Sequence, residues 1–247
     1  MTTRAEFMAR IRAELGKTRG LPPATPARRP ARPRVEAEAI RAELAERWPE
    51  ALERFRHELE KVGGVFYRVA TLAEVVPVVA GIARERAARR LVSWHAAELG
   101  GDLEPALTAH GLEPVAMPPG EVASAAERQR LRELVAAAEL GLTGADLAIA
   151  ETGTLVLSSG AGRPRSTSLL PPYHIALFDR TALVESLAQA GVFLELWHAD
   201  GAPGPRGAVI SLITGPSRTA DIELTLTRGV HGPKEVHAIF VEALIRG

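Results

Sequence analysis

Apolar runs of strand length alternate with stretches of helical periodicity between residues 65 and 140, and this alternation constrains the fold more than any other feature. The predicted order is strand 65–69, helix 71–88, strand 90–94, helix 103–110, strand 114–117 and helix 124–140, with Gly141 ending the last helix. Strands that alternate with helices in this way are typical of a mostly parallel sheet with helices on its faces. The sequence therefore predicts an α/β protein.

The pattern changes after Gly144. Further apolar runs predict strands at 146–150, 154–157, 174–178, 208–213 and 236–241, and a helix is predicted at 181–190. Glu-Thr-Gly separates the first two of these runs, which predicts two adjoining strands joined by a sharp turn or bulge. The segment between the last two strands is the richest in turn-forming and polar residues.

The first 34 residues differ from the rest of the chain. Residues 1–17 are predicted to form an amphipathic helix, because Thr3 and Glu6 have capping-box spacing and apolar residues follow at helical intervals. Residues 18–34 contain five Pro and five Arg, which predicts an extended linker. We expect the compact domain to span 35–247, beginning with a helical stretch that breaks at Trp48–Pro49 and then resumes.

Charge is distributed unevenly along the chain. Residues 1–34 carry nine Lys and Arg against two Glu, whereas the whole chain has a net charge of zero, so the remainder is acidic. A basic segment of this kind could dock nucleic acid, an anionic lipid surface or a partner protein. We favour a solvated, flexible arm, which could fold back on its own domain.

The chain contains no cysteine, which excludes disulfides, iron–sulfur clusters and thiolate-bound zinc. The N-terminal residues lack the apolar core of a signal peptide, and no apolar run approaches membrane-spanning length. A cytoplasmic location is therefore expected. The histidines lack the spacing of a metal-binding helix, so no metal site is predicted.

The segment from Thr214 to Glu223 is the first candidate for chemistry. It follows a predicted strand, and a short helix is expected to begin near Thr219 and to end at Gly229. Free N–H groups at the start of a helix bind anions, and Arg218 could add a bidentate contact to a carboxylate or phosphate. A purely structural turn and helix cap is an equally good interpretation.

Two further segments contain candidate catalytic residues. Glu151 lies between two apolar runs, where its carboxylate could act as a base or nucleophile or form a structural ion pair, with Arg218 as one conceivable partner. His231 lies between glycines and could serve as a general acid or base. The candidate residues for binding an anion or substrate are Thr152, Gly153, Thr154, Gly215, Ser217, Arg218, Thr219 and Asp221.

A stretch rich in Gly, Arg and Ser at 160–168 matches neither the Walker nor the dinucleotide fingerprint. We interpret it as a hairpin tip in preference to a phosphate-binding loop. His174, which opens a predicted strand, is interpreted as structural. His95 follows a predicted strand and could border a ligand-binding crevice.

Three long segments together resemble the lactate utilization protein C (LutC/YkgG) family, which is built on a LUD domain. They are residues 141–157, 168–176, and 215–223 with 229–233. The resemblance implies the NagB/RpiA/CoA-transferase-like fold, in which a Rossmann-like, mostly parallel sheet lies between helices and a smaller antiparallel part is added. It also implies a role in oxidising L-lactate to pyruvate alongside partner proteins that resemble iron–sulfur oxidoreductase subunits. Because this chain has no cysteine, the clusters would belong to the partners, and this chain would carry no cofactor.

Three functions are compatible with the sequence. The first is a non-redox subunit of a lactate-oxidising complex. The second is a stand-alone enzyme on a small anionic substrate, such as a sugar phosphate isomerase, CoA transferase or folate cyclo-ligase, with Arg218 holding the anion, Glu151 as base or nucleophile and His231 assisting. The third, a module that contacts nucleic acid through its basic segment, ranks last.

Overall fold

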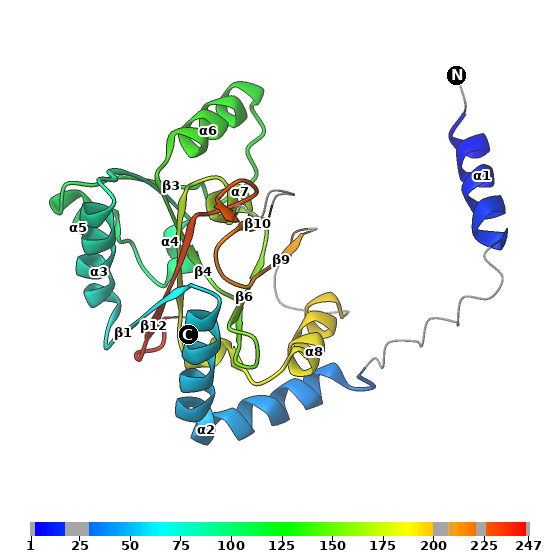
Figure 1. Cartoon of the computed structure of the whole chain (residues 1–247), viewed down its shortest axis with the longest axis horizontal. Helices are drawn as coiled ribbons and strands as arrows, with labels where there is room; N and C mark the ends of the chain where they lie inside the picture. Colours follow the sequence, from blue (N-terminus) through cyan, green and yellow to red (C-terminus); the bar gives the residue numbers. More distant parts are fainter. Residues whose placement is uncertain (1–2, 18–29, 200–206, 208, 221–225, 246–247) are drawn as a thin grey trace.

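A six-stranded parallel sheet forms the centre of the protein in the computed structural model, which describes residues 3–17, 30–199, 207, 209–220 and 226–245 (Figure 1). Each strand is parallel to its neighbours. The order across the sheet is β1 (Val65–Val69), β12 (Glu235–Val241), β7 (Tyr173–Phe178), β4 (Leu140–Gly144), β2 (Arg90–Ser93) and β3 (Glu113–Ala116). The predicted mostly parallel α/β sheet is confirmed; its placement in the NagB/RpiA/CoA-transferase-like superfamily stays a prediction.

A second, four-stranded sheet packs beside the first. Its order is β8 (Leu183–Val184), β5 (Leu147–Ile149), β6 (Thr154–Ser158) and β9 (Ile210–Ile213). The β5–β6 and β6–β9 pairs are antiparallel, and β5 is parallel to β8. The turn predicted between the runs on either side of Glu-Thr-Gly is therefore present, and this sheet is the smaller part of the fold.

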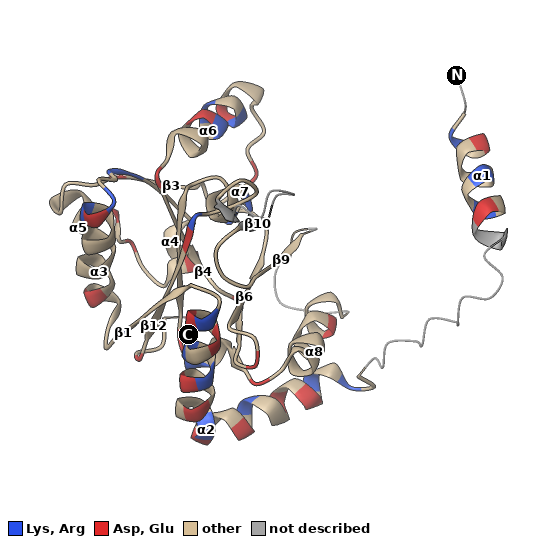
Figure 2. Cartoon of the chain, in the orientation of Figure 1, with Lys and Arg blue, Asp and Glu red and all other residues tan. Residues whose placement is uncertain are grey.

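Helices flank the sheets. They are α2 (Pro33–Lys61), α3 (Leu72–Glu85), α4 (Ala96–Leu99), α5 (Glu104–Ala109), α6 (Ala125–Ala137), α7 (Ser166–Leu169), the 3-10 helix η1 (Arg180–Ala182) and α8 (Leu187–His198). Helices α2 and α3 contact β1, α6 contacts β2, and α7 contacts β4 and β7. Charged residues concentrate on helices and loops, whereas β4 and β7 in the middle of the parallel sheet and the strands of the second sheet contain none (Figure 2).

Helix α2 contributes aromatic side chains to the core. The Phe55 ring lies 5.1 Å from Phe178 at the end of β7, and Trp48 stacks at 5.5 Å on Phe240 of β12. Phe55, Phe178 and Phe240 are buried almost completely. Full burial of a Phe side chain contributes about 1.5–3 kcal/mol. These contacts fix α2 across the sheet.

The predicted break at Trp48–Pro49 is wrong, because α2 continues through Pro49 for 29 residues. Proline removes one backbone hydrogen bond and bends a helix without necessarily ending it. Figure 1 shows α2 bending part-way along its length. The buried residues Ala51, Leu52 and Phe55 beyond the proline hold the second half against the core.

Three other predicted helices differ from the structure. Helix α6 ends at Ala137, so the apolar residues from Leu140 form β4, a fully buried strand whose composition resembles a helix end. The stretch 181–190 divides into η1, β8 and the start of α8, because Asp179 and Ser186 each cap a new helix. The helix predicted near Thr219 is replaced by an antiparallel pair, β10 (Arg218–Ala220) and β11 (Leu226–Arg228).

The N-terminal segment contains helix α1 (Arg4–Lys17). Its first turn has reciprocal bonds, in which Thr3 N donates to Glu6 Oε2 at 2.7 Å and Glu6 N donates to Thr3 Oγ1 at 3.3 Å. Its apolar side chains Phe7, Met8 and Ile11 are exposed. Residues 18–29 of the predicted linker lie outside the described residues.

Candidate functional site

The Glu-Thr-Gly-Thr turn lies at the amino-terminal edge of the parallel sheet, against the last turn of α2. Gly153 has φ +61°, and a Cβ at this position would lie 2.3 Å from Leu59 N. Thr154 Oγ1 lies 2.7 Å from the hydroxyls of both Thr152 and Thr214, which joins this turn to the end of β9. The motif therefore fastens the small sheet to α2.

The segments around Gly215 and His231 meet at the same edge. Gly215 has φ +83° and packs against Val62. Ser217 N donates to Pro233 O at 2.9 Å, and its carbonyl accepts from Gly229 N at 3.1 Å. His231 is exposed. These bonds place the loop directly before β12, so the two sequence segments are neighbours as a result of backbone pairing.

The structure brings only some of the predicted catalytic and binding residues close together. Glu151 is half-buried, and its N–H donates to Glu185 O at 3.0 Å. Arg218 and Thr219 lie in β10, and Asp221 lies outside the described residues. The helix that would have supplied a dipole for an anion is absent from this place, because Arg218–Ala220 is a strand. The roles of Glu151, His231 and Arg218 stay predictions.

A cavity of about 720 Å³ opens at the opposite, carboxyl-terminal edge of the sheet. Met117 directly follows β3, and its N–H donates at 2.9 Å to the carbonyl of Ser93, the last residue of β2. Helix α6, the loop after β3 and the segment 160–170 form the walls. This volume lies in the range of about 300–1,000 Å³ typical of cofactor and drug-sized ligands, and the carboxyl ends of parallel strands are where such ligands bind.

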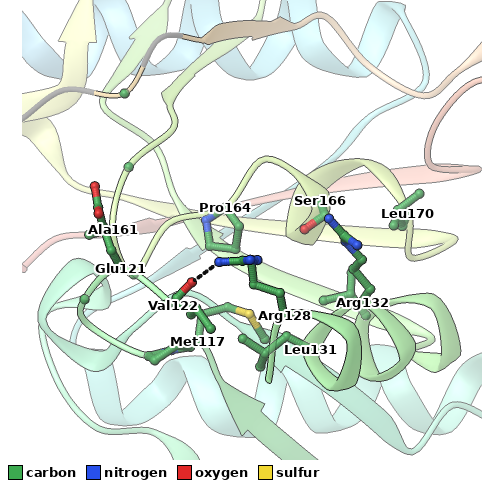
Figure 3. A pocket seen from close by; sticks show the side chains of 16 residues that line it. Met117, Glu121, Val122, Arg128, Leu131, Arg132, Ala161, Pro164, Ser166 and Leu170 are labelled. Atoms are coloured by element: carbon green, nitrogen blue, oxygen red, sulfur yellow. Dashed lines mark hydrogen bonds between the residues drawn. The ribbon is translucent and has the colours of Figure 1, made fainter. Parts of the chain in front are cut away.

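Two arginines and several apolar side chains line this cavity. Arg128 and Arg132 are one turn apart on α6, next to Leu131 and Val135. In Figure 3 the side chains of both arginines extend across the cavity, Arg128 toward Pro164 and Arg132 toward Ser166. Arg128 Nη1 also donates to Val122 O at 2.8 Å. The arrangement suits an anionic ligand that has an apolar part.

A buried arginine holds the loop that forms one wall. Arg163 Nη2 forms an ion pair with Asp146, Nη1 lies 3.0 Å from Glu98 Oε2, and Nε donates to Ser158 O at 2.8 Å. The guanidinium lies 4.7 Å from the centre of the Trp94 ring. Because the loop tip is closed by a Gly160–Arg163 bridge, the predicted hairpin is present, and this network fixes it beside the cavity.

His95 supports a loop beside the cavity, whereas His174 lies in the protein core. The Nδ1 atom of His95 accepts from Ala97 N at 3.3 Å, and the backbone N–H of His95 donates to Gly162 O at 2.8 Å, so this residue positions the same loop. His174 is fully buried, with Nε2 2.9 Å from Thr143 Oγ1, and burial lowers its pKa to about 3. A histidine with this pKa stays neutral at physiological pH. Within the described ranges, no group of three or more His, Cys, Asp or Glu is arranged to hold a metal.

Sequence reasoning missed the arginines of α6. A signal was present, because Arg128, Leu131, Arg132 and Val135 are spaced to share one face of the predicted helix at 124–140. Two basic residues on a partly apolar face are also typical of an ordinary amphipathic helix. The cavity forms only because segment 160–170 lies opposite this face of the helix.

The family model described as the LUD domain matches residues 52–241. The chain belongs to the LUD domain family. Its match begins within α2 and ends with β12, and so contains both sheets. The predicted family is confirmed, and α1 lies outside the matched LUD domain.

Two curated relatives of this LUD protein are both named lactate utilization protein C. The protein from Exiguobacterium sp. is 32% identical over 99% of this chain and 98% of its own length. The protein from Halalkalibacterium halodurans is 45% identical, but the match covers 49% of this chain and about half, 52%, of that protein. A solved structure of a DUF162 family protein from Deinococcus radiodurans has a TM-score of 0.51 and 21% identity, covering 78% of this chain and 98% of its own. This last similarity supports the fold alone.

None of the helices of this LUD protein within the described ranges is both long enough and apolar enough to cross a bilayer.

Proposed function

We propose that this chain is a non-redox component of an L-lactate utilization system that acts with iron–sulfur partner proteins in the cytoplasm. The observation that supports this most strongly is the similarity to a lactate utilization protein C along nearly the full length of both chains. The absence of cysteine adds to it, because thiolate-ligated clusters would have to belong to other proteins.

Deletion of the gene in its native host tests this proposal. In a strain without another lactate dehydrogenase, we expect growth on L-lactate to be lost and growth on pyruvate to be retained, because the block would lie before pyruvate. A tagged copy that restores growth should co-purify with cysteine-rich iron–sulfur proteins. Undiminished growth of the deletion strain on L-lactate would contradict the proposal.

A stand-alone enzyme on a small anionic substrate is the second candidate, and the cavity between α6 and segment 160–170 favours it. Arg128 and Arg132 would hold the anionic group, and the apolar wall would hold the rest of the ligand. Sugar phosphates, CoA esters, nucleotides and folates are the classes to screen. Candidate chemistry at Glu151 or His231 would need a separate test, because those residues lie at the opposite edge of the sheet.

The double variant Arg128→Gln/Arg132→Gln tests the cavity. A ligand at about 100 times its Kd should raise the melting temperature of the native chain by roughly 5–10 °C, and this rise should be lost in the double variant. Arg130→Gln is the matched control, since Arg130 is exposed on the same helix and is not part of the lining. An equal rise in the double variant and the control would place the ligand elsewhere.

A further inference from the structure

A second, smaller cavity of about 180 Å³ opens at the carboxyl ends of β4 and β7, near the middle of the parallel sheet. Its lining residues are Arg41, Ala145, Asp146, Phe178, Asp179, Thr181, Ala182, Trp197 and Ile245. Asp146 also bonds Arg163, whose loop lines the large cavity, so the two cavities lie on either side of that ion pair. The small volume falls well below the roughly 300–1,000 Å³ of drug-sized sites, so a ligand here has few heavy atoms.

Arg41 of α2 lines this cavity and provides a positive charge with one unsatisfied N–H group. Its Nη1 is buried and has no partner among the described residues, and its guanidinium lies 4.4 Å from the centre of the Phe193 ring. Burial lowers the pKa of Arg41, and the charge of Asp179 partly opposes this, but an arginine stays protonated in proteins. A buried cationic donor without an acceptor is unfavourable. An anionic ligand group beside the guanidinium would balance this partly buried charge.

Asp179 provides a hydrogen-bond acceptor in the same cavity. The residue is 2% exposed, Oδ1 accepts from both N and Oγ1 of Thr181, and Oδ2 accepts from Ile245 N at 2.8 Å. An ionised carboxylate offers about four lone-pair positions. One position therefore remains for a donor group of a ligand.

We propose that this cavity binds a small 2-hydroxycarboxylate, with the carboxylate on Arg41 and the hydroxyl donating to Asp179. The two protein groups require an anionic group and a hydrogen-bond donor in one molecule of few atoms. Ala145, Ala182 and the ring of Trp197 supply apolar surface for a short alkyl group. The choice of L-lactate as the member of this class rests on the proposed function; the requirement for the class rests on Arg41 and Asp179.

The site discriminates between the two oxidation states of such a ligand. A 2-hydroxyl group can donate to Asp179, whereas a 2-oxo group only accepts, and would place two acceptors against each other in a buried site. A missing or mismatched buried hydrogen bond of this kind costs about 1–3 kcal/mol. We therefore expect pyruvate to bind about 5- to 150-fold more weakly than L-lactate, which tests Asp179 without altering the protein.

Titration calorimetry of the full chain with L-lactate, pyruvate and inorganic phosphate tests the proposal. We expect binding of L-lactate, weaker binding of pyruvate, and loss of lactate binding in Arg41→Gln. Arg47→Gln is the matched control, because Arg47 is exposed on the same helix and pairs with Glu185 at 3.1 Å. Circular dichroism of both variants establishes that each is folded.

Three results would overturn the site: no lactate binding by the native chain, unchanged binding in folded Arg41→Gln, or phosphate and pyruvate binding as tightly as lactate. Growth of the deletion strain separates this outcome from the proposed function. If folded Arg41→Gln binds lactate as the native chain does, while the deletion strain fails to grow on L-lactate, the site is excluded and the proposed function stands. If the deletion strain never required the gene, the proposed function fails, and calorimetry alone decides the site.

Discussion

Arg163→Ala is expected to lower the free energy of unfolding by about 3–5 kcal/mol, which corresponds to a fall in melting temperature of roughly 6–20 °C. Asp146 is 2% exposed at its side chain and pairs with Arg163, so the substitution would remove an ion pair from a buried carboxylate. The hydrogen bond to Ser158 O and the contact with the Trp94 ring would be lost as well. Chemical denaturation monitored by tryptophan fluorescence measures the change.

Arg165→Ala is the matched control for this experiment. Arg165 is two residues away in the same loop and is exposed, so its truncation should change stability by no more than about 0.5 kcal/mol. If Arg163→Ala were as stable as Arg165→Ala, the buried network would not hold the loop. Loss of ligand-induced stabilisation in Arg163→Ala, under conditions where it is still folded, would further link the network to the large cavity.

Gly153→Ala is expected to cost about 2–5 kcal/mol of stability. The backbone at Gly153 has φ +61°, a left-handed conformation that disfavours side chains, and the added Cβ would lie 2.3 Å from Leu59 N of α2. The obstacle is backbone in a buried helix turn, so the turn or the helix would have to move. Urea denaturation compared with the native chain measures the loss.

Gly191→Ala is expected to have the opposite effect on stability. Gly191 lies within α8, and a Cβ there would meet no atom within 4 Å. Alanine is favoured over glycine inside a helix by about 0.5–1 kcal/mol, so this variant should be slightly more stable than the native chain. A destabilised Gly191→Ala variant, or a neutral Gly153→Ala variant, would contradict the packing described around α2 and α8.

The parallel sheet was predictable because its strands are short apolar runs bounded by turn residues. β1 occupies the predicted 65–69, and β2 and β3 differ from prediction by about one residue at their ends. The strand β4 was missed because Leu140–Gly144 directly follows a helix and is buried on both faces, so that it lacks any period-2 alternation. Whether such a run forms a strand or a helix depends on the neighbouring strands of the sheet, which are distant in sequence.

The candidate site was less predictable than the fold. The sequence predicted Thr154 and Gly215 to bind a ligand. The structure places both near the end of α2, where their contacts join parts of the fold. A helix was predicted where β10 pairs with β11. The periodicity of apolar residues within one segment does not show which other segment its backbone pairs with, and here the partners lie several residues away. Arg41 could not be identified from the sequence, since its contact with Phe193 and its unsatisfied nitrogen depend on how α2 packs against another helix.

The large cavity is lined almost entirely by residues outside the sequence segments that resemble the family. Among the described lining residues, Leu170 alone falls within 141–157, 168–176, 215–223 or 229–233. Substitutions in α6 or in the loop after β3 would therefore alter what the cavity accepts and leave the family signature intact. Members that share the signature need not share a ligand, and grouping them by chemistry calls for comparison of the cavity wall, position by position.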